Sequence, residues 1–299
     1  MTKLKLLDLF SGIGGFSLGL ERTGGFETVA FCEIEVFCQK VLKKHWPDVP
    51  IYEDVRTIDY DETIDVICGG FPCQDISIAG KGAGIKGEKS GLWKEFKRNI
   101  SKYQPKYAII ENVSALCGRG LEVVLQDIAE IGYDATWTML DTKYSGKPQR
   151  RRRVYILAVR DGVPINADIF RFAERSTNKH KQEMATIEKS FAWDFTQGAG
   201  KRKPFAFFTR QRSDQFACTG LSSTLAKRDY KSYTDLVVEG GYIRRVTPQE
   251  RMSLQGFPSD WMEDLGLTNQ QQFTCNGMST TVVENVGEMI TEFDRTCNA

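Results

Sequence analysis

Histidine is scarce in this chain, and its cysteines are not paired. Among 299 residues there are two histidines, His45 and His180, and eight cysteines that never form a Cys-x-x-Cys pair. Neither histidine follows a predicted strand, so a cysteine–histidine protease or a histidine-rich metal site has little to be built from. The scattered cysteines also argue against a zinc site and a disulfide framework. We therefore expect no metal.

Long hydrophobic runs are also missing. No stretch approaches the roughly 20 apolar residues of a membrane span, and residues 1–5 lead into a strand pattern without a signal-peptide cleavage region. We expect a cytoplasmic protein with no membrane partner. The chain contains no internal repeat, and its hydrophobic content of 41% is enough to bury a core in one large domain or two modest ones.

Charge is distributed unevenly along the chain. The net charge is only +1, but the segment from Lys143 to Arg245 holds 22 Lys and Arg against 10 Asp and Glu. Because phosphates are bound by Lys and Arg, this segment indicates a surface that meets a polyanion. A solvated basic face without a partner is the alternative.

A glycine- and proline-rich loop follows a short apolar run in the first half of the chain. Ile64–Cys68 is typical of a buried parallel strand, and the loop after it ends in Cys73. A second predicted strand, Tyr107–Ile110, ends in Glu111, so the thiol and the carboxyl lie at the same edge, where open α/β sheets bind ligands. A buried structural glutamate would need a cationic partner, and the functional interpretation of Glu111 is favoured. The thiol of Cys73 needs a helix N-terminus or nearby arginines to ionise at neutral pH.

The N-terminal segment has the pattern of a nucleoside-binding unit. A predicted strand, Leu4–Phe10, runs into the glycine turn Gly12–Gly15 and then into a helix. Glu33 ends the next strand, roughly 20 residues after the glycines, where an acid accepts hydrogen bonds from ribose hydroxyls. Asp54 follows a third strand and could accept from an adenine amino group, or it could be a surface acid that caps a turn.

The regular alternation of strands and helices stops after Gly162. Before that point, Arg150–Arg153 lead into a predicted strand, in which Arg151 and Arg153 share one face. Regular structure returns at Thr247, which begins a capping box with Glu250, and again in a C-terminal helix that packs back on the first domain. We assign residues 1–162 and 265–299 to a catalytic, cofactor-binding domain and residues 163–264 to a second domain.

Six motifs follow one another over nearly the whole chain. They are Asp8-Leu9-Phe10-Ser11-Gly12-Ile13-Gly14-Gly15, Gly70-Phe71-Pro72-Cys73-Gln74, Glu111-Asn112-Val113, Pro148-Gln149-Arg150-Arg151-Arg152-Arg153, Gln255-Gly256-Phe257-Pro258 and Asn276-Gly277-Met278-Ser279. In this order they resemble the cytosine-5 DNA methyltransferase family of prokaryotic or phage type. The resemblance implies an α/β fold with a Rossmann-like sheet dependent on S-adenosylmethionine, and a smaller, irregular target-recognition domain.

The resemblance also implies a mechanism. Cys73 would attack carbon 6 of a cytosine flipped out of the duplex, while Glu111 bonds or protonates ring nitrogen 3. Carbon 5 would then take the methyl group of S-adenosylmethionine, leaving S-adenosylhomocysteine as product. Arg153 and Arg151 match arginines that contact the oxygen of the base or the adjoining phosphate. The remaining catalytic candidates, expected to position loops, are Asn112 and Gln149.

Further residues fall where the family binds its cofactor or its DNA. The predicted cofactor contacts are Phe10, Gly12, Ile13, Gly14, Gly15, Glu33, Ile34, Asp54, Val55, Gly70, Pro72, Leu92, Asn276 and Ser279. The predicted DNA contacts are Arg210, Arg212, Thr224, Lys227 and Arg228. For any single residue of the second set, phosphate contact or core packing is the alternative to reading a base.

These inferences predict a DNA methyltransferase that modifies carbon 5 of cytosine in double-stranded DNA. We expect a monomer, and a cognate restriction endonuclease is a further candidate partner. Two alternatives stay open: methylation of tRNA cytosine on the same fold, and a catalytically silent DNA-binding module. The presence of both Cys73 and Glu111 argues against the second alternative.

Overall fold

The structure is a computed structural model. It describes residues 2–72, 92–163, 206–209, 217–219, 221–225, 229, 235–239, 242–275 and 277–297. Among these residues, no helix is long and apolar enough to cross a membrane.

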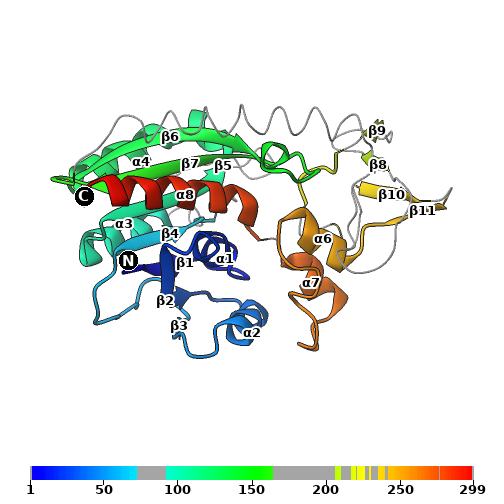
Figure 1. Ribbon diagram of the computed structural model, residues 1–299, viewed down its shortest axis with the longest axis horizontal. Helices are drawn as coiled ribbons and strands as arrows, with labels where there is room; N and C mark the ends of the chain where they lie inside the picture. Colours follow the sequence, from blue (N-terminus) through cyan, green and yellow to red (C-terminus); the bar gives the residue numbers. More distant parts are fainter. Residues whose placement is uncertain are drawn as a thin grey trace.

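A seven-stranded sheet forms the centre of the molecule (Figure 1). Its order is β3-β2-β1-β4-β5-β7-β6, and β7 alone runs opposite to the other six strands. The order reverses between β1 and β4, which is where open α/β sheets bind ligands at the carboxyl ends of their strands. The strands are β1 (Leu4–Leu9), β2 (Phe26–Cys32), β3 (Ile51–Tyr52), β4 (Val66–Gly69), β5 (Tyr107–Val113), β6 (Tyr133–Asp141) and β7 (Arg152–Arg160).

Helices cover both faces of this sheet, which explains why its inner strands are mostly apolar on both faces. On β5, Tyr107 and Ile109 join one core cluster with side chains of α1 and α8, and Ala108 and Ile110 join another with side chains of α3 and α4. Figure 1 shows α8 lying along the sheet. The helices are α1 (Gly15–Glu21), α3 (Trp93–Tyr103), α4 (Leu121–Glu130) and α8 (Thr280–Cys297).

A third core cluster joins the first half of the chain to the segment that follows the basic region. Ile13 and Val41 of the first half pack with Met252, Phe257 and Trp261. The cluster crosses the predicted domain boundary, which stays a prediction. The helices that contribute are α2 (Val36–His45) and α6 (Pro248–Leu254), and Cys275, which directly follows α7 (Asn269–Thr274), is another member. The predicted capping box is present, since Thr247 accepts from the Glu250 amide and Glu250 accepts from that of Thr247.

A smaller antiparallel sheet of four strands, in the order β11-β10-β8-β9, lies within the predicted recognition region. Figure 1 shows it beside α6, away from the large sheet. Its strands are β8 (Ala206–Thr209), β9 (Ala217–Thr219), β10 (Asp235–Glu239) and β11 (Tyr242–Arg245). The fold therefore has the predicted class: one α/β sheet with a smaller second region.

Candidate active site

The turn after β1 has an unusual backbone that its neighbours hold in place. Phe10, Gly12 and Gly14 all have positive φ, of 55°, 56° and 82°. The Ser11 hydroxyl donates to the Asp8 carbonyl at 2.6 Å and accepts from the Cys32 amide at 3.2 Å. A non-glycine residue in this region is strained and persists only where the surroundings impose it. The turn is therefore anchored to both β1 and β2.

Glu33 connects this turn to the end of β2. One carboxylate oxygen accepts from the Gly12 amide at 2.7 Å, and the other accepts from the Glu35 amide at 2.8 Å. The residue is buried, but an ionised carboxylate offers about four acceptor positions and could take ribose hydroxyls as well. The next side chain, Ile34, is 71% exposed. A buried acid can accept from the ribose of a nucleoside, and a large exposed apolar side chain beside it can cover the base.

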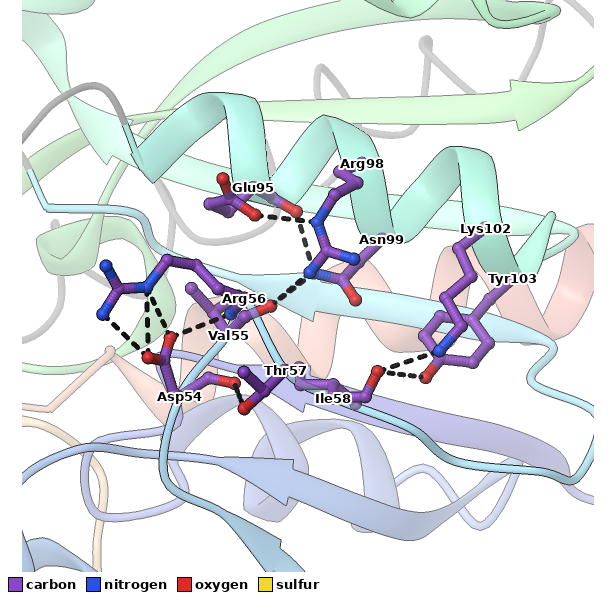
Figure 2. A network of polar contacts seen from close by, with 10 residues as sticks. All are labelled: Asp54, Val55, Arg56, Thr57, Ile58, Glu95, Arg98, Asn99, Lys102 and Tyr103. Atoms are coloured by element: carbon purple, nitrogen blue, oxygen red, sulfur yellow. Dashed lines mark hydrogen bonds and ion pairs between the residues drawn. The ribbon is translucent and has the colours of Figure 1, made fainter.

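Asp54 has its carboxylate occupied in this structure (Figure 2). It accepts from the Arg56 amide at 2.9 Å, and Arg56 Nη2 lies 2.7 Å from Asp54 Oδ2. The hydrogen bonds from the Arg56 side chain lower the pKa of this carboxyl. This geometry agrees with the surface acid that caps a turn, and the contact with adenine stays a prediction.

Val55 is fixed to α3 through its backbone carbonyl. Its side chain is buried, and its carbonyl accepts from Arg98 Nη2 at 2.8 Å and from Asn99 Nδ2 at 3.0 Å (Figure 2). Leu92, directly before α3, is half-buried and packs against the core cluster that contains Val55 and side chains of α3.

Glu111 forms the centre of the second part of the site. It is buried at the end of β5, with Oε1 3.2 Å from Arg153 Nε and 3.8 Å from Arg151 Nη2. Both arginines reach one side, as the alternation predicts, while Arg150 and Arg152 are exposed. The other carboxylate oxygen faces the loop after β4, because a Cβ at Gly70 would lie 2.9 Å from Glu111 Oε2. Gly70 therefore lets the acid approach the loop that leads to Cys73.

Asn112 ties the end of β5 to that same loop. It is buried, donates through Nδ2 to the Phe71 carbonyl at 3.1 Å and accepts through Oδ1 from the Val113 amide at 2.8 Å. Pro72 is half-buried beside it. Several predicted residues lie outside the described residues: Cys73, Arg210, Arg212, Lys227, Arg228 and Asn276.

The predicted recognition region contacts the segment that carries the arginines. Gln149 is fully buried and pairs in a parallel bridge with Ser222, whose amide donates to the Pro148 carbonyl at 2.8 Å. Thr224, a predicted DNA contact, donates its hydroxyl to the Arg150 carbonyl at 2.8 Å. Ser222 and Thr224 of the predicted recognition region thus contact the residues that directly precede Arg151 in the chain.

Four residues in these networks were not predicted from the sequence as site residues. Asp8 is buried under the turn and accepts from the Ser17 hydroxyl at 2.8 Å, and burial raises its pKa to about 7. A buried acid within an apolar strand is a signal that the sequence did offer. The others are Asp235, which accepts from Ser223; Met278, which a Cβ at Gly15 would touch; and Trp261, which donates to Ile13.

Comparison with known proteins identifies the family. The sequence model of the C-5 cytosine-specific DNA methylases matches residues 4–292. The chain belongs to this family. It is 30% identical to the type II methyltransferase M.NgoBI of Neisseria gonorrhoeae, over 94% of this chain and 90% of that protein. It is 31% identical to the type II methyltransferase M2.BsuMI of Bacillus subtilis, over 97% of this chain and 76% of that protein.

A solved structure supports the fold. The Dnmt2 methyltransferase of S. pombe superposes with a TM-score of 0.71 at 16% identity, over 99% of this chain and all of that one. Family and fold together support the use of S-adenosylmethionine. The activity is DNA cytosine-5 methylation, which is supported over both alternatives.

Proposed function

We propose that Cys73 and Glu111 are the two groups of this methyltransferase that activate the cytosine ring. The observation that carries the proposal is the position of Glu111, buried at the carboxyl end of β5 between Arg153 and the loop after β4. That loop continues directly into Cys73. The thiolate and the carboxyl can thus approach one base from two neighbouring strands.

The bonds of the reaction form and break on the cytosine ring. The thiolate of Cys73 adds to carbon 6, and the electron pair of the 5,6 double bond makes carbon 5 nucleophilic while Glu111 bonds or protonates nitrogen 3. S-adenosylmethionine supplies the methyl group when it is bound. A base, which we take to be a water molecule, then removes the proton from carbon 5. The double bond re-forms and the bond between carbon 6 and sulfur breaks, which restores the thiolate of Cys73. A proton that Glu111 has given to nitrogen 3 returns to the carboxylate in the same step. Arg153 and Arg151 contact the base oxygen or its phosphate, and Asn112 and Gln149 hold the loops in place.

The residues present fit the cofactor. The turn around Gly12 leaves open space, because a Cβ there would meet nothing within 4 Å. We propose that this space receives the carboxylate of the methionine part, that Glu33 accepts from the ribose hydroxyls, and that Ile34 covers the adenine. The other residues proposed for this site are Phe10, Ile13, Gly14, Gly15, Asp54, Val55, Gly70, Pro72, Leu92, Asn276 and Ser279. The reaction so described requires no metal.

We propose double-stranded DNA as the substrate, bound by a monomer in the cytoplasm. Flipping the target base costs a few kcal/mol, which the basic recognition region would offset through phosphate contacts. The names of the two relatives, both type II methyltransferases, support a cognate restriction endonuclease as partner.

Methylation of a plasmid that carries random sequence tests the proposal directly. We expect labelled methyl groups from S-adenosylmethionine to appear at carbon 5 of cytosine within one sequence context, and Cys73→Ala to abolish the transfer. Retained transfer by Cys73→Ala would rule out the covalent route. Supplying tRNA in parallel tests the alternative substrate, and label on tRNA alone would exclude DNA as the substrate.

A further inference from the structure

Trp261 reaches the cofactor turn from the far end of the sequence. It is buried in the segment after α6, and its indole Nε1 donates to the Ile13 carbonyl at 3.0 Å. Ile13 stands in the middle of the turn and is itself only 1% exposed. A buried carbonyl needs a hydrogen-bond donor, so this bond cannot be replaced by water without rearrangement.

The ring of Trp261 is held on several sides. His45, the last residue of α2, stacks on it with ring centroids 3.4 Å apart and an interplanar angle of 4°, and His45 Nε2 lies 2.8 Å from the Trp261 carbonyl. Trp46 meets the same ring edge-on at 5.7 Å, and Phe257 lies at 5.4 Å. The indole N–H therefore has one fixed direction, toward Ile13.

This hydrogen bond completes the anchoring of one peptide unit in the turn. The amide of Gly14 donates to the Ser11 carbonyl at 2.9 Å, while the carbonyl of the same unit, on Ile13, accepts from Trp261. With both ends bonded, the unit cannot rotate independently. Glycines on either side would otherwise permit other conformations, because Gly12 and Gly14 carry no Cβ to restrict them. The neighbouring Trp46 closes the space beside Gly14, where a Cβ would lie 2.6 Å from its ring.

We infer that Trp261 is a positioning residue for the cofactor: its hydrogen bond to Ile13 holds the turn in the conformation that receives S-adenosylmethionine. The inference rests on the proposed assignment of this turn to the cofactor. When the turn is already ordered before binding, the free energy of binding is not reduced by the cost of ordering it. Loss of the bond should therefore weaken cofactor binding in particular.

Trp261→Phe tests this inference, because it keeps an aromatic ring and removes the N–H. We expect the dissociation constant of S-adenosylhomocysteine, measured by calorimetry on the full chain without DNA, to rise roughly 5- to 30-fold. The KM for S-adenosylmethionine should rise by a similar factor, whereas the KM for DNA and the kcat at saturating cofactor should stay within about twofold. Tyr133→Phe is the matched control, since it also removes one buried hydrogen bond to a backbone carbonyl, that of Pro105, but far from the turn.

An unchanged dissociation constant in Trp261→Phe would overturn the inference, and so would an equal rise in Tyr133→Phe. If Trp261→Phe does not yield folded protein, His45→Gln decides in its place. That variant removes the stacked ring and should weaken binding about 2- to 5-fold, and wild-type affinity in it would overturn the inference. Failure of the wild-type chain to bind S-adenosylhomocysteine would instead refute the proposed cofactor site.

Discussion

Replacement of Gly70 by alanine should separate the proposed catalytic role of Glu111 from its contribution to stability. The new Cβ would lie 2.9 Å from Glu111 Oε2, whereas ordinary contacts begin near 3.4 Å. The carboxylate must therefore retract by about half an ångström, and it is the flexible end of a side chain that can do so without moving the backbone. Retraction changes the contact with Arg153, now 3.2 Å.

The expected magnitudes differ for stability and for catalysis. Gly70 does not have positive φ, so alanine can adopt its backbone and gains about 0.4–1 kcal/mol from the smaller entropy of the unfolded chain. This gain offsets much of the cost of the contact, and we expect the free energy of unfolding to change by no more than about 1 kcal/mol. A positioned proton donor contributes roughly 100- to 10,000-fold to a rate, so a displaced Glu111 should lower kcat at least about 100-fold.

Steady-state methylation over a range of cofactor concentrations, at saturating DNA, measures kcat and KM, with urea unfolding alongside. Gly118→Ala is the control, because a Cβ there meets nothing within 4 Å and its backbone does not have positive φ. A kcat of Gly70→Ala within threefold of the wild type would refute the reasoning. A rise in KM for the cofactor with unchanged kcat would also refute it, since the Cβ would then obstruct the cofactor rather than Glu111.

Three further predictions concern buried polar groups. Burial raises the pKa of Asp8 in the folded state to about 7, above the roughly 4 of an unfolded chain. Ionisation of Asp8 therefore lowers the free energy of unfolding progressively as pH rises from about 4 to 7. Asp8→Asn should therefore gain up to about 4 kcal/mol relative to the wild type between pH 4 and pH 8 in urea unfolding. Asn112→Asp removes the donor to the Phe71 carbonyl, which should cost about 1–3 kcal/mol in unfolding and lower the single-turnover rate. Arg251→Met breaks the buried pair with Asp229, 2.9 Å long, and should cost about 3–5 kcal/mol by thermal or urea unfolding.

Each of these predictions has a contradicting result. A stability difference for Asp8→Asn that is constant across pH would mean that Asp8 titrates normally. A wild-type rate in Asn112→Asp would show that its bond does not position the loop. Lys5→Met, which breaks an exposed pair with Glu62, is the control for Arg251→Met, and an equal effect of the two would contradict the burial argument.

Local pattern and sheet geometry were enough to predict the positions of the main groups. Apolar runs identified the strands, and the rule that parallel strands end at one edge placed Glu33 and Glu111 correctly. The capping box at Thr247 is equally local, and it is confirmed. The two-residue spacing of Asp54 and Arg56 is also local, but several arrangements of such a pair are possible, and only the structure shows the ion pair.

Contacts between distant segments could not be predicted in the same way. Trp261 and Ile13 are 248 positions apart, and nothing in either local sequence indicates the other. The strands of the small sheet have only 3 to 5 residues and basic, aromatic surroundings, so no alternation identifies them. Asp235 holds the Ser223 amide and hydroxyl only because that sheet forms. These residues depend on tertiary structure, which overrides local preference.

The direction of β7 explains why Arg151 and Arg153 lie beside Glu111. In a parallel sheet, residues at the start of a strand lie at the edge opposite to the ligands. Because β7 is antiparallel to β5, Arg153 pairs with Val113, and the start of β7 lies at the edge where β5 ends. Had the nine residues of β7 run parallel, the arginines would lie roughly 25 Å from Glu111 at about 3.3 Å per residue. The reversed strand thus brings two cations to the carboxylate, and it also places Gln149, just before it, against the recognition region at Ser222.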